Sequence, residues 1–195
     1  MPASLEVRGR GPITTYESAS KEEINVISRL AHAPAAKALG DDLARNKAAI
    51  EALTRQHLGL RKHDTCTVLE RRQWIRGGFN MCVFLAIETG GQSRKVVFRY
   101  PMPHKLAEAQ YPGTVDEKLG SEVGAYVWMQ EKCPDVRIPH LYGFGFSDGR
   151  HVSFASFDSH HLLLNLHLYL VHPCPSQVFP IAHFAHVLAL RLRPV

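Results

Sequence analysis

Apolar residues recur at helical spacing in the first third of the chain and at strand spacing in the middle. Ser20 and Glu23 have the spacing of a helix capping box, and apolar residues repeat every three or four positions over 24–31. This pattern predicts a helix that Pro34 ends, followed by a second helix over 42–58. We therefore expect this part of the chain to be mainly helical.

From Cys66 onward the apolar residues alternate with a period of two, which is typical of strands. Glycine turns and prolines separate these runs, and one amphipathic helix interrupts them. The predicted strands lie within 66–71, 81–88, 95–99, 138–145 and 151–154, and the predicted helix covers 114–132. The order of the elements predicts an α+β fold, with a five-stranded antiparallel sheet and one packed helix behind a helical extension.

Changes in composition and in the period of the apolar residues divide the chain into four segments. A flexible lead-in (1–19) and the helical extension (20–60) precede the strand-rich segment (61–154). The last segment, 155–195, follows no regular period, holds six histidines and contains neither Lys nor Glu. We interpret it as an irregular tail that does not continue the sheet.

The composition excludes several classes of protein. Of the 195 residues, 45% are hydrophobic and 21% are charged, which is ordinary for a globular domain. The net charge of +5 is modest and unclustered, so a dedicated nucleic-acid-binding protein is not expected. No long apolar run predicts a membrane span or a secretory signal. Four dispersed cysteines without a CxxC pair favour reduced thiols and a cytoplasmic location.

A glycine turn between two predicted strands is the first candidate binding site. Residues 74–80 have the sequence Trp-Ile-Arg-Gly-Gly-Phe-Asn, in which Gly77 and Gly78 let backbone N–H groups approach an anion. The turn matches neither a Walker A sequence nor GxGxxG. The alternative is a plain hairpin, which is what a glycine pair between strands usually forms.

Glu122 is the second candidate, because its position places it along the apolar face of the predicted helix. A carboxylate at the edge of a core needs a cation. Arg99 and Lys95, on the preceding strand, are the nearest cations in the sequence and share one strand face with each other. Glu122 is then part of a phosphate-binding site, a member of a structural ion pair, or a carboxylate that extends to water.

Four segments in order carry a resemblance to a known family: the glycine turn at 74–80, then 95–101, 118–123 and 138–145. The region from about His57 to Phe154, about half of the chain, resembles the small lobe of aminoglycoside-phosphotransferase and choline-kinase-like proteins, in their fungal branch. The resemblance implies binding of ATP or GTP with magnesium between two lobes, and phosphoryl transfer to a hydroxyl. By position, it implies that the nucleotide phosphates are held by Gly77, Gly78, Phe79, Asn80 and Arg99, with Glu122 supporting Arg99.

The chain departs from this family in the residues that perform the transfer. The family's large lobe carries a His-Gly-Asp…Asn loop and a following Asp motif, and neither occurs here. After Phe154 the only acidic residue is Asp158, and Asn165 is the only amide that resembles the Asn of that loop. We therefore assign no catalytic residue and expect a truncated family member. The irregular tail suggests a retained intron or a wrong gene model.

Two functional hypotheses follow. The first is a fragment of a phosphotransferase that is inactive alone, and the second is a non-catalytic interaction module that binds a protein partner. The tail offers two weaker alternatives, a metal site and a peripheral membrane contact, but its histidine spacings match no standard zinc set. The tail histidines are His160, His161, His167, His172, His183 and His186.

Overall fold

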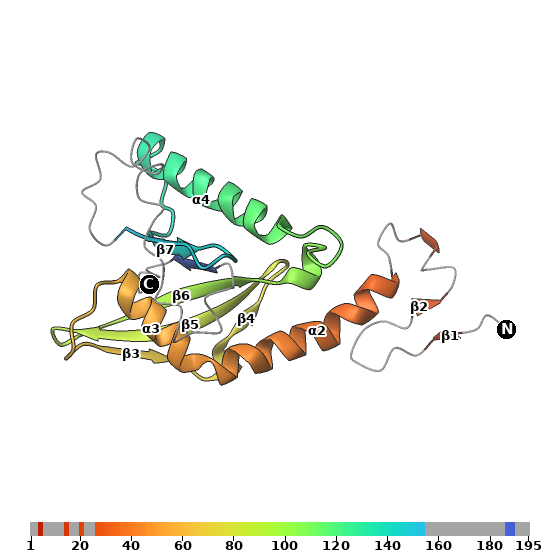
Figure 1. Ribbon diagram of the computed structural model, residues 1–195, viewed down its shortest axis with the longest axis horizontal. Helices are drawn as coiled ribbons and strands as arrows, with labels where there is room; N and C mark the ends of the chain where they lie inside the picture. Colours follow the sequence, from red (N-terminus) through yellow and green to blue (C-terminus); the bar gives the residue numbers. More distant parts are fainter. Residues whose placement is uncertain (1–3, 6–13, 16–19, 22–25, 155–185, 190–195) are drawn as a thin grey trace.

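The computed structural model describes residues 4–5, 14–15, 20–21, 26–154 and 186–189. Its fold is α+β, and every strand pairing in it is antiparallel. Figure 1 shows α4 on one side of the sheet and the helices α2 and α3 on the other. The three helices are α2 (Val26–Arg45), α3 (Lys47–His57) and α4 (Thr114–Lys132). The last of these confirms the helix predicted over 114–132.

The prediction that Pro34 ends the first helix is wrong, because α2 continues through it to Arg45. A proline inside a helix removes the hydrogen bond to the carbonyl of the residue four positions earlier, here Leu30. Pro34 and Leu30 are both exposed, so water is available to that carbonyl, and four alanines within 33–38 favour the helix. The break falls instead at Asn46, and Glu23 of the expected capping box lies outside the described residues.

The predicted strands of the middle segment occur in the predicted order with small shifts of their ends, but Ile75–Arg76, expected within the glycine turn, form an additional short strand. Two short 3₁₀ turns, η1 (Arg71–Gln73) and η2 (Pro103–Lys105), precede β4 and follow β6. Gly90 and Gly91, both with positive φ, form the tight hairpin between β5 and β6. The strands are β3 (Thr65–Val68), β4 (Ile75–Arg76), β5 (Asn80–Thr89), β6 (Gln92–Pro101), β7 (Leu141–Gly145) and β8 (His151–Ser153).

The sheet contains more strands than the five predicted. Residues 65–153 contribute two groups, β3 to β6 and the hairpin of β7 and β8. A further strand, β9 (His186–Ala189), pairs with both β6 and β7 and joins the groups into one sheet of seven strands, in the order β3-β5-β6-β9-β7-β8 with β4 on β5. The expectation that the tail does not continue the sheet is therefore wrong for 186–189, where a four-residue strand is too short to show a period.

The structure describes only part of the two ends of the chain, so it tests only some of the predictions made for them. Within the lead-in, β1 (Ser4–Leu5) and β2 (Thr14–Thr15) form a small antiparallel ladder. Asp158, Asn165 and the tail histidines other than His186 lie outside the described residues. Among the helices that the structure describes, none has the length and apolar character needed to cross a bilayer.

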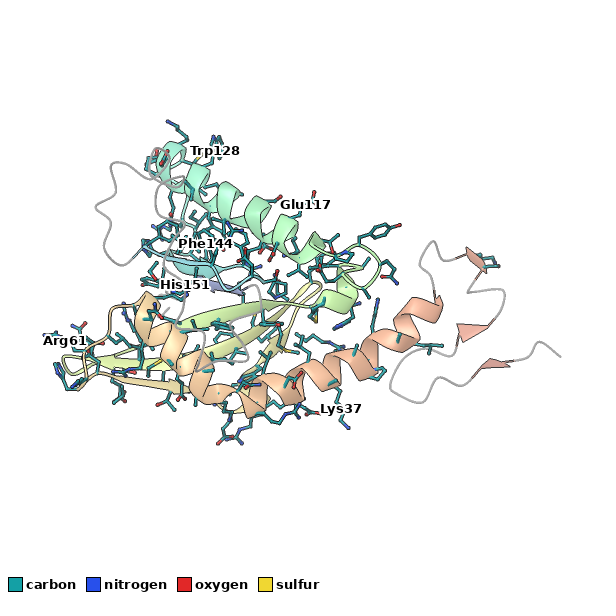
Figure 2. The ribbon with its side chains drawn as sticks, in the orientation of Figure 1. Lys37, Arg61, Glu117, Trp128, Phe144 and His151 are labelled. Atoms are coloured by element: carbon teal, nitrogen blue, oxygen red, sulfur yellow. The ribbon has the colours of Figure 1, made fainter. Side chains whose placement is uncertain are left out.

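Two apolar clusters lie in the molecule. The first joins α2 and α3 to β3, β5 and β6, and the second joins α4 to β7 and β8. Figure 2 shows Phe144 of the second cluster beneath α4. The largest fully buried side chain is Phe98, at 0% exposure, in the first cluster. The buried residues of the first cluster alternate along β5 and β6: Met81, Val83, Leu85, Ile87, Val96, Phe98 and Tyr100.

Candidate functional site

The start of α4 is fixed by a carboxylate from the preceding loop. Gly113 occupies the N-cap position with φ of 100°, so it has no side chain to cap the helix. Glu108 supplies the cap instead: its Oε1 accepts from the Gly113 N–H at 2.7 Å, and its Oε2 accepts from the Val115 N–H at 2.7 Å and from Thr114 Oγ1 at 2.9 Å. Because α4 carries Glu122, this cap helps to position the site.

The register of the sheet sets which face Arg99 occupies. Arg99 of β6 lies directly opposite Cys82 of β5, and residues in such a pair share a face. Their neighbours Phe98 and Val83 are fully buried in the cluster that faces α2 and α3. Arg99 therefore lies on the other face, toward α4.

Glu122 meets two cations on a single oxygen. Arg99 Nη2 is 3.4 Å from Glu122 Oε1, which confirms the predicted contact between sheet and helix. Lys118 Nζ is closer to the same oxygen, at 2.5 Å. The three side chains are about one-fifth to one-quarter exposed: Arg99 21%, Glu122 26% and Lys118 19%. Oε2 of Glu122 is shut off from solvent and has no hydrogen-bond partner among the described residues.

Asn80, at the first position of β5, connects these cations to the glycine turn. In one orientation of its amide, the oxygen accepts from Lys118 Nζ at 3.5 Å, the outer limit of a hydrogen bond. In the other, the oxygen accepts from Arg99 Nη2 at 2.8 Å and the nitrogen donates to the Phe79 carbonyl at 3.3 Å. The second orientation satisfies both ends of the amide. We name the group Arg99, Glu122, Lys118 and Asn80 the charged cluster.

The glycine turn differs in detail from the expected phosphate loop. The Gly77 N–H donates to the Asn80 carbonyl at 2.8 Å, so this donor closes the turn and is not available to a ligand. Gly78 and Phe79 form the exposed tip, and within the described part of the chain their N–H groups have no hydrogen-bond partner. An added Cβ on Gly78 meets nothing within 4 Å. The open donors of the turn are therefore those of Gly78 and Phe79.

The cluster also changes the chemistry of Cys82. Burial raises the pKa of this thiol, and the charge of Glu122 raises it further, whereas Arg99 opposes both effects. Cys82 is consequently a neutral thiol at pH 7. Among the residues that the structure describes, no group of three or more His, Cys, Asp or Glu side chains is arranged to hold a metal ion.

Lys118 is the member of the charged cluster that was not predicted from the sequence. The sequence does contain a pattern that predicts this contact, because Lys118 precedes Glu122 by four residues, a spacing that places both on one side of a helix. Lys95, the other cation expected near Glu122, is exposed and forms no ion pair with a described carboxylate. The structure thus brings Arg99, Glu122 and Asn80 together beside the turn and leaves Lys95 outside.

The chain matches no family model, no curated protein and no solved structure in the three comparisons with known proteins. The geometry of the charged cluster is therefore the basis for a functional proposal.

Proposed function

We propose that the charged cluster and the turn tip bind the phosphates of a nucleotide, ATP or GTP, in a kinase-like small lobe related to the aminoglycoside phosphotransferases. The observation that carries the proposal is that Arg99 and Lys118 share one oxygen of Glu122. Two cations and one carboxylate leave a net charge of +1 in a partly buried place, where water screens charge less completely than on an open surface. An anion adjacent to Arg99 and Lys118 balances that charge.

The turn also supplies neutral donors. The N–H groups of Gly78 and Phe79 are open, and Asn80 connects the turn to Arg99. Backbone N–H groups and guanidinium or ammonium groups are the usual partners of phosphate oxygens. These groups fit the phosphate part of the ligand, and Glu122 holds the two cations in place.

The same residues do not fit magnesium. Magnesium binds oxygen ligands, most often carboxylates. In the described part of the chain, the carboxylate of this cluster is that of Glu122, and its charge is already balanced by Arg99 and Lys118. We therefore derive no step that passes through a metal ion held by this cluster.

Phosphoryl transfer by this chain alone is not part of the proposal. Transfer depends on an Asp that orients the acceptor hydroxyl and on groups that place the metal ion. The sequence contains no His-Gly-Asp loop to supply them. We expect no phosphate release from ATP or GTP by the purified chain, and release that Arg99→Ala abolishes would contradict this.

Calorimetry with ATP and GTP in the presence of magnesium tests the binding. We expect a Kd well above the micromolar range, because a two-lobed pocket buries most of its ligand and this lobe offers one wall. Arg99→Ala and Lys118→Ala should each weaken binding about tenfold or more, since each removes a charge-assisted hydrogen bond.

Lys95→Ala is the matched control, because Lys95 lies on the same strand face as Arg99 but outside the cluster. This variant should bind nucleotide as the unmodified chain does. Equal losses in Lys95→Ala and Arg99→Ala would mean that the general positive charge, and not the cluster, attracts the nucleotide. Unchanged binding in Arg99→Ala would reject the proposal.

A further inference from the structure

A second group of basic side chains lies where α2 passes η2. His32 comes from α2, His104 and Lys105 come from η2, and Arg76 comes from β4. The imidazole rings of His32 and His104 lie with their centroids 5.6 Å apart. Figure 1 shows the N-terminal half of α2 beside the connection between β6 and α4, which contains η2. We name these four residues the histidine cluster.

The histidine cluster is tied to the same glycine turn as the charged cluster. The Met102 N–H, just before η2, donates to the Phe79 carbonyl at 2.8 Å. Arg76 immediately precedes Gly77 and lies opposite Met81, which belongs to the apolar cluster that faces α2 and α3. Because opposite residues share a face, Arg76 lies on the α2 side of the sheet. The two clusters therefore flank the turn from opposite faces.

Two imidazole nitrogens in the histidine cluster lack a partner. Nδ1 of His32 and Nε2 of His104 are shut off from solvent and have no hydrogen bond among the described residues. Such atoms are uncommon in folded proteins, because a buried polar atom without a partner is costly. The two atoms lie on neighbouring rings from two different elements, and both residues are only half-buried, so a small turn of each ring would present its nitrogen to a polar ligand.

The side chains of described residues whose charges act on the two rings are all basic. Burial lowers the pKa of His104, and His32, Lys105 and Arg76 lower it further. Burial also lowers the pKa of His32, and Lys105 adds to this effect, whereas the His104 backbone beside the ring opposes both. Neither Arg76 nor Lys105 forms an ion pair with a described carboxylate. Two basic side chains beside two imidazoles that each carry an unpartnered nitrogen suit an anion and disfavour a metal cation.

We propose that His32, His104, Lys105 and Arg76 form a second anion site, which binds a phosphate-class anion independently of Arg99 and Lys118. Lys105 and Arg76 supply the charge, and the two imidazoles donate N–H groups to the anion's oxygens when they are protonated. The site does not depend on nucleotide binding at the charged cluster.

The test is a titration of the full chain with pyrophosphate, without magnesium, followed by calorimetry and by NMR of the histidine rings. We expect the signals of His32 and His104 to shift and the pKa of both rings to rise at saturation, because a bound anion stabilises the imidazolium form. Lys105→Ala and His104→Gln should each weaken binding about tenfold. Unchanged ring signals at millimolar pyrophosphate would reject the site.

Two control variants distinguish this site from the charged cluster and from a general attraction of anions to positive charge. Lys62→Ala removes the same charge as Lys105→Ala from an exposed position in the loop before β3, so it should bind pyrophosphate as the unmodified chain does. Arg99→Ala should leave the shifts of His32 and His104 intact, even if it abolishes nucleotide binding. Loss of these ring shifts in Arg99→Ala, or equal weakening in Lys62→Ala and Lys105→Ala, would overturn the proposal. Circular dichroism of each variant shows whether it is folded.

Discussion

The two faces of β5 and β6 differ in what they contribute to the protein. The face toward α2 and α3 is apolar and closed, with Val83, Leu85 and Phe98 at 0% exposure. The face toward α4 is less tightly closed: Val97 is 2% exposed there, but Cys82 and Phe84 are only half-buried, and Arg99 reaches Glu122. Burial of apolar area is the main source of stability, so we assign stability to the first face. The second face tolerates charge and carries the candidate site.

Phe98→Ala should have the largest effect on stability. Removing a fully buried aromatic side chain costs about 3–5 kcal/mol, because apolar area is lost and a cavity remains. Phe84→Ala on the other face is the matched control, and its half-buried ring should cost clearly less. Denaturant unfolding of both variants gives the comparison. Equal losses would show that the two faces contribute alike and would remove the distinction between them.

Gly143→Ala tests the contact between α3 and the hairpin of β7 and β8. A Cβ at this position would lie 2.3 Å from His57 Nδ1 and 2.8 Å from the Val152 carbonyl oxygen. His57 is fully buried and its Nδ1 is 2.8 Å from Ser153 Oγ, so it cannot move without breaking that hydrogen bond.

We therefore expect Gly143→Ala to cost about 1–3 kcal/mol, the range typical of overpacking. Gly120→Ala, in an exposed and open position of α4, should instead stabilise the protein by up to about 1 kcal/mol. Thermal unfolding of the two variants shows whether Gly143→Ala lowers and Gly120→Ala raises the stability of the protein. A neutral Gly143→Ala would mean that His57 moves freely.

These positions also indicate how much the sequence alone could predict. The helix at 114–132 was predicted correctly because its apolar residues recur at helical spacing, and the contact of Glu122 with Arg99 followed from strand alternation and helix spacing. The full burial of His57 could not be predicted, because it depends on the approach of β7 and β8, which are distant in the sequence.

The failed expectations have a common physical cause. Pro34 looked like a helix end because local rules ignore whether the freed carbonyl can reach water. The strand at 186–189 was missed because its pairing with β6 and β7 is a long-range interaction that leaves no local period. The histidine cluster was missed because His32 and His104 lie on elements that only the tertiary fold brings together.

Glu122→Gln should have a smaller effect on stability than either core substitution. The change leaves Arg99 and Lys118 without their shared counter-charge, but all three side chains are partly exposed and water screens much of the penalty. We expect a loss of about 1 kcal/mol. A double-mutant cycle with Lys118→Met, followed by urea unfolding, measures the coupling. A loss as large as that of Phe98→Ala would place the charged cluster in the stabilising core.

Glu108→Gln should have the smallest effect, which depends on pH. The hydrogen bond from the Gly113 N–H, with those from Val115 and Thr114, holds the pKa of the Glu108 carboxyl below its usual range. A carboxyl whose pKa is lower in the folded state stabilises that state above the unfolded pKa, and the contribution disappears as the pH falls through the folded value. We expect a loss of about 0.5–1 kcal/mol at pH 7, typical of a helix cap.

The difference between Glu108→Gln and the unmodified chain should shrink as the pH falls from about 4 through the lowered pKa of Glu108, because below that pKa both side chains are uncharged. Glu117→Gln is the control, because Glu117 is exposed in the first turn of the same helix and its side chain caps no N–H group of the described residues. Urea unfolding between pH 3 and pH 7 compares the three proteins. A loss that does not change with pH would assign the cap to the shape of the side chain and not to its charge. In that case α4 would hold Glu122 and Lys118 in place equally well at low pH.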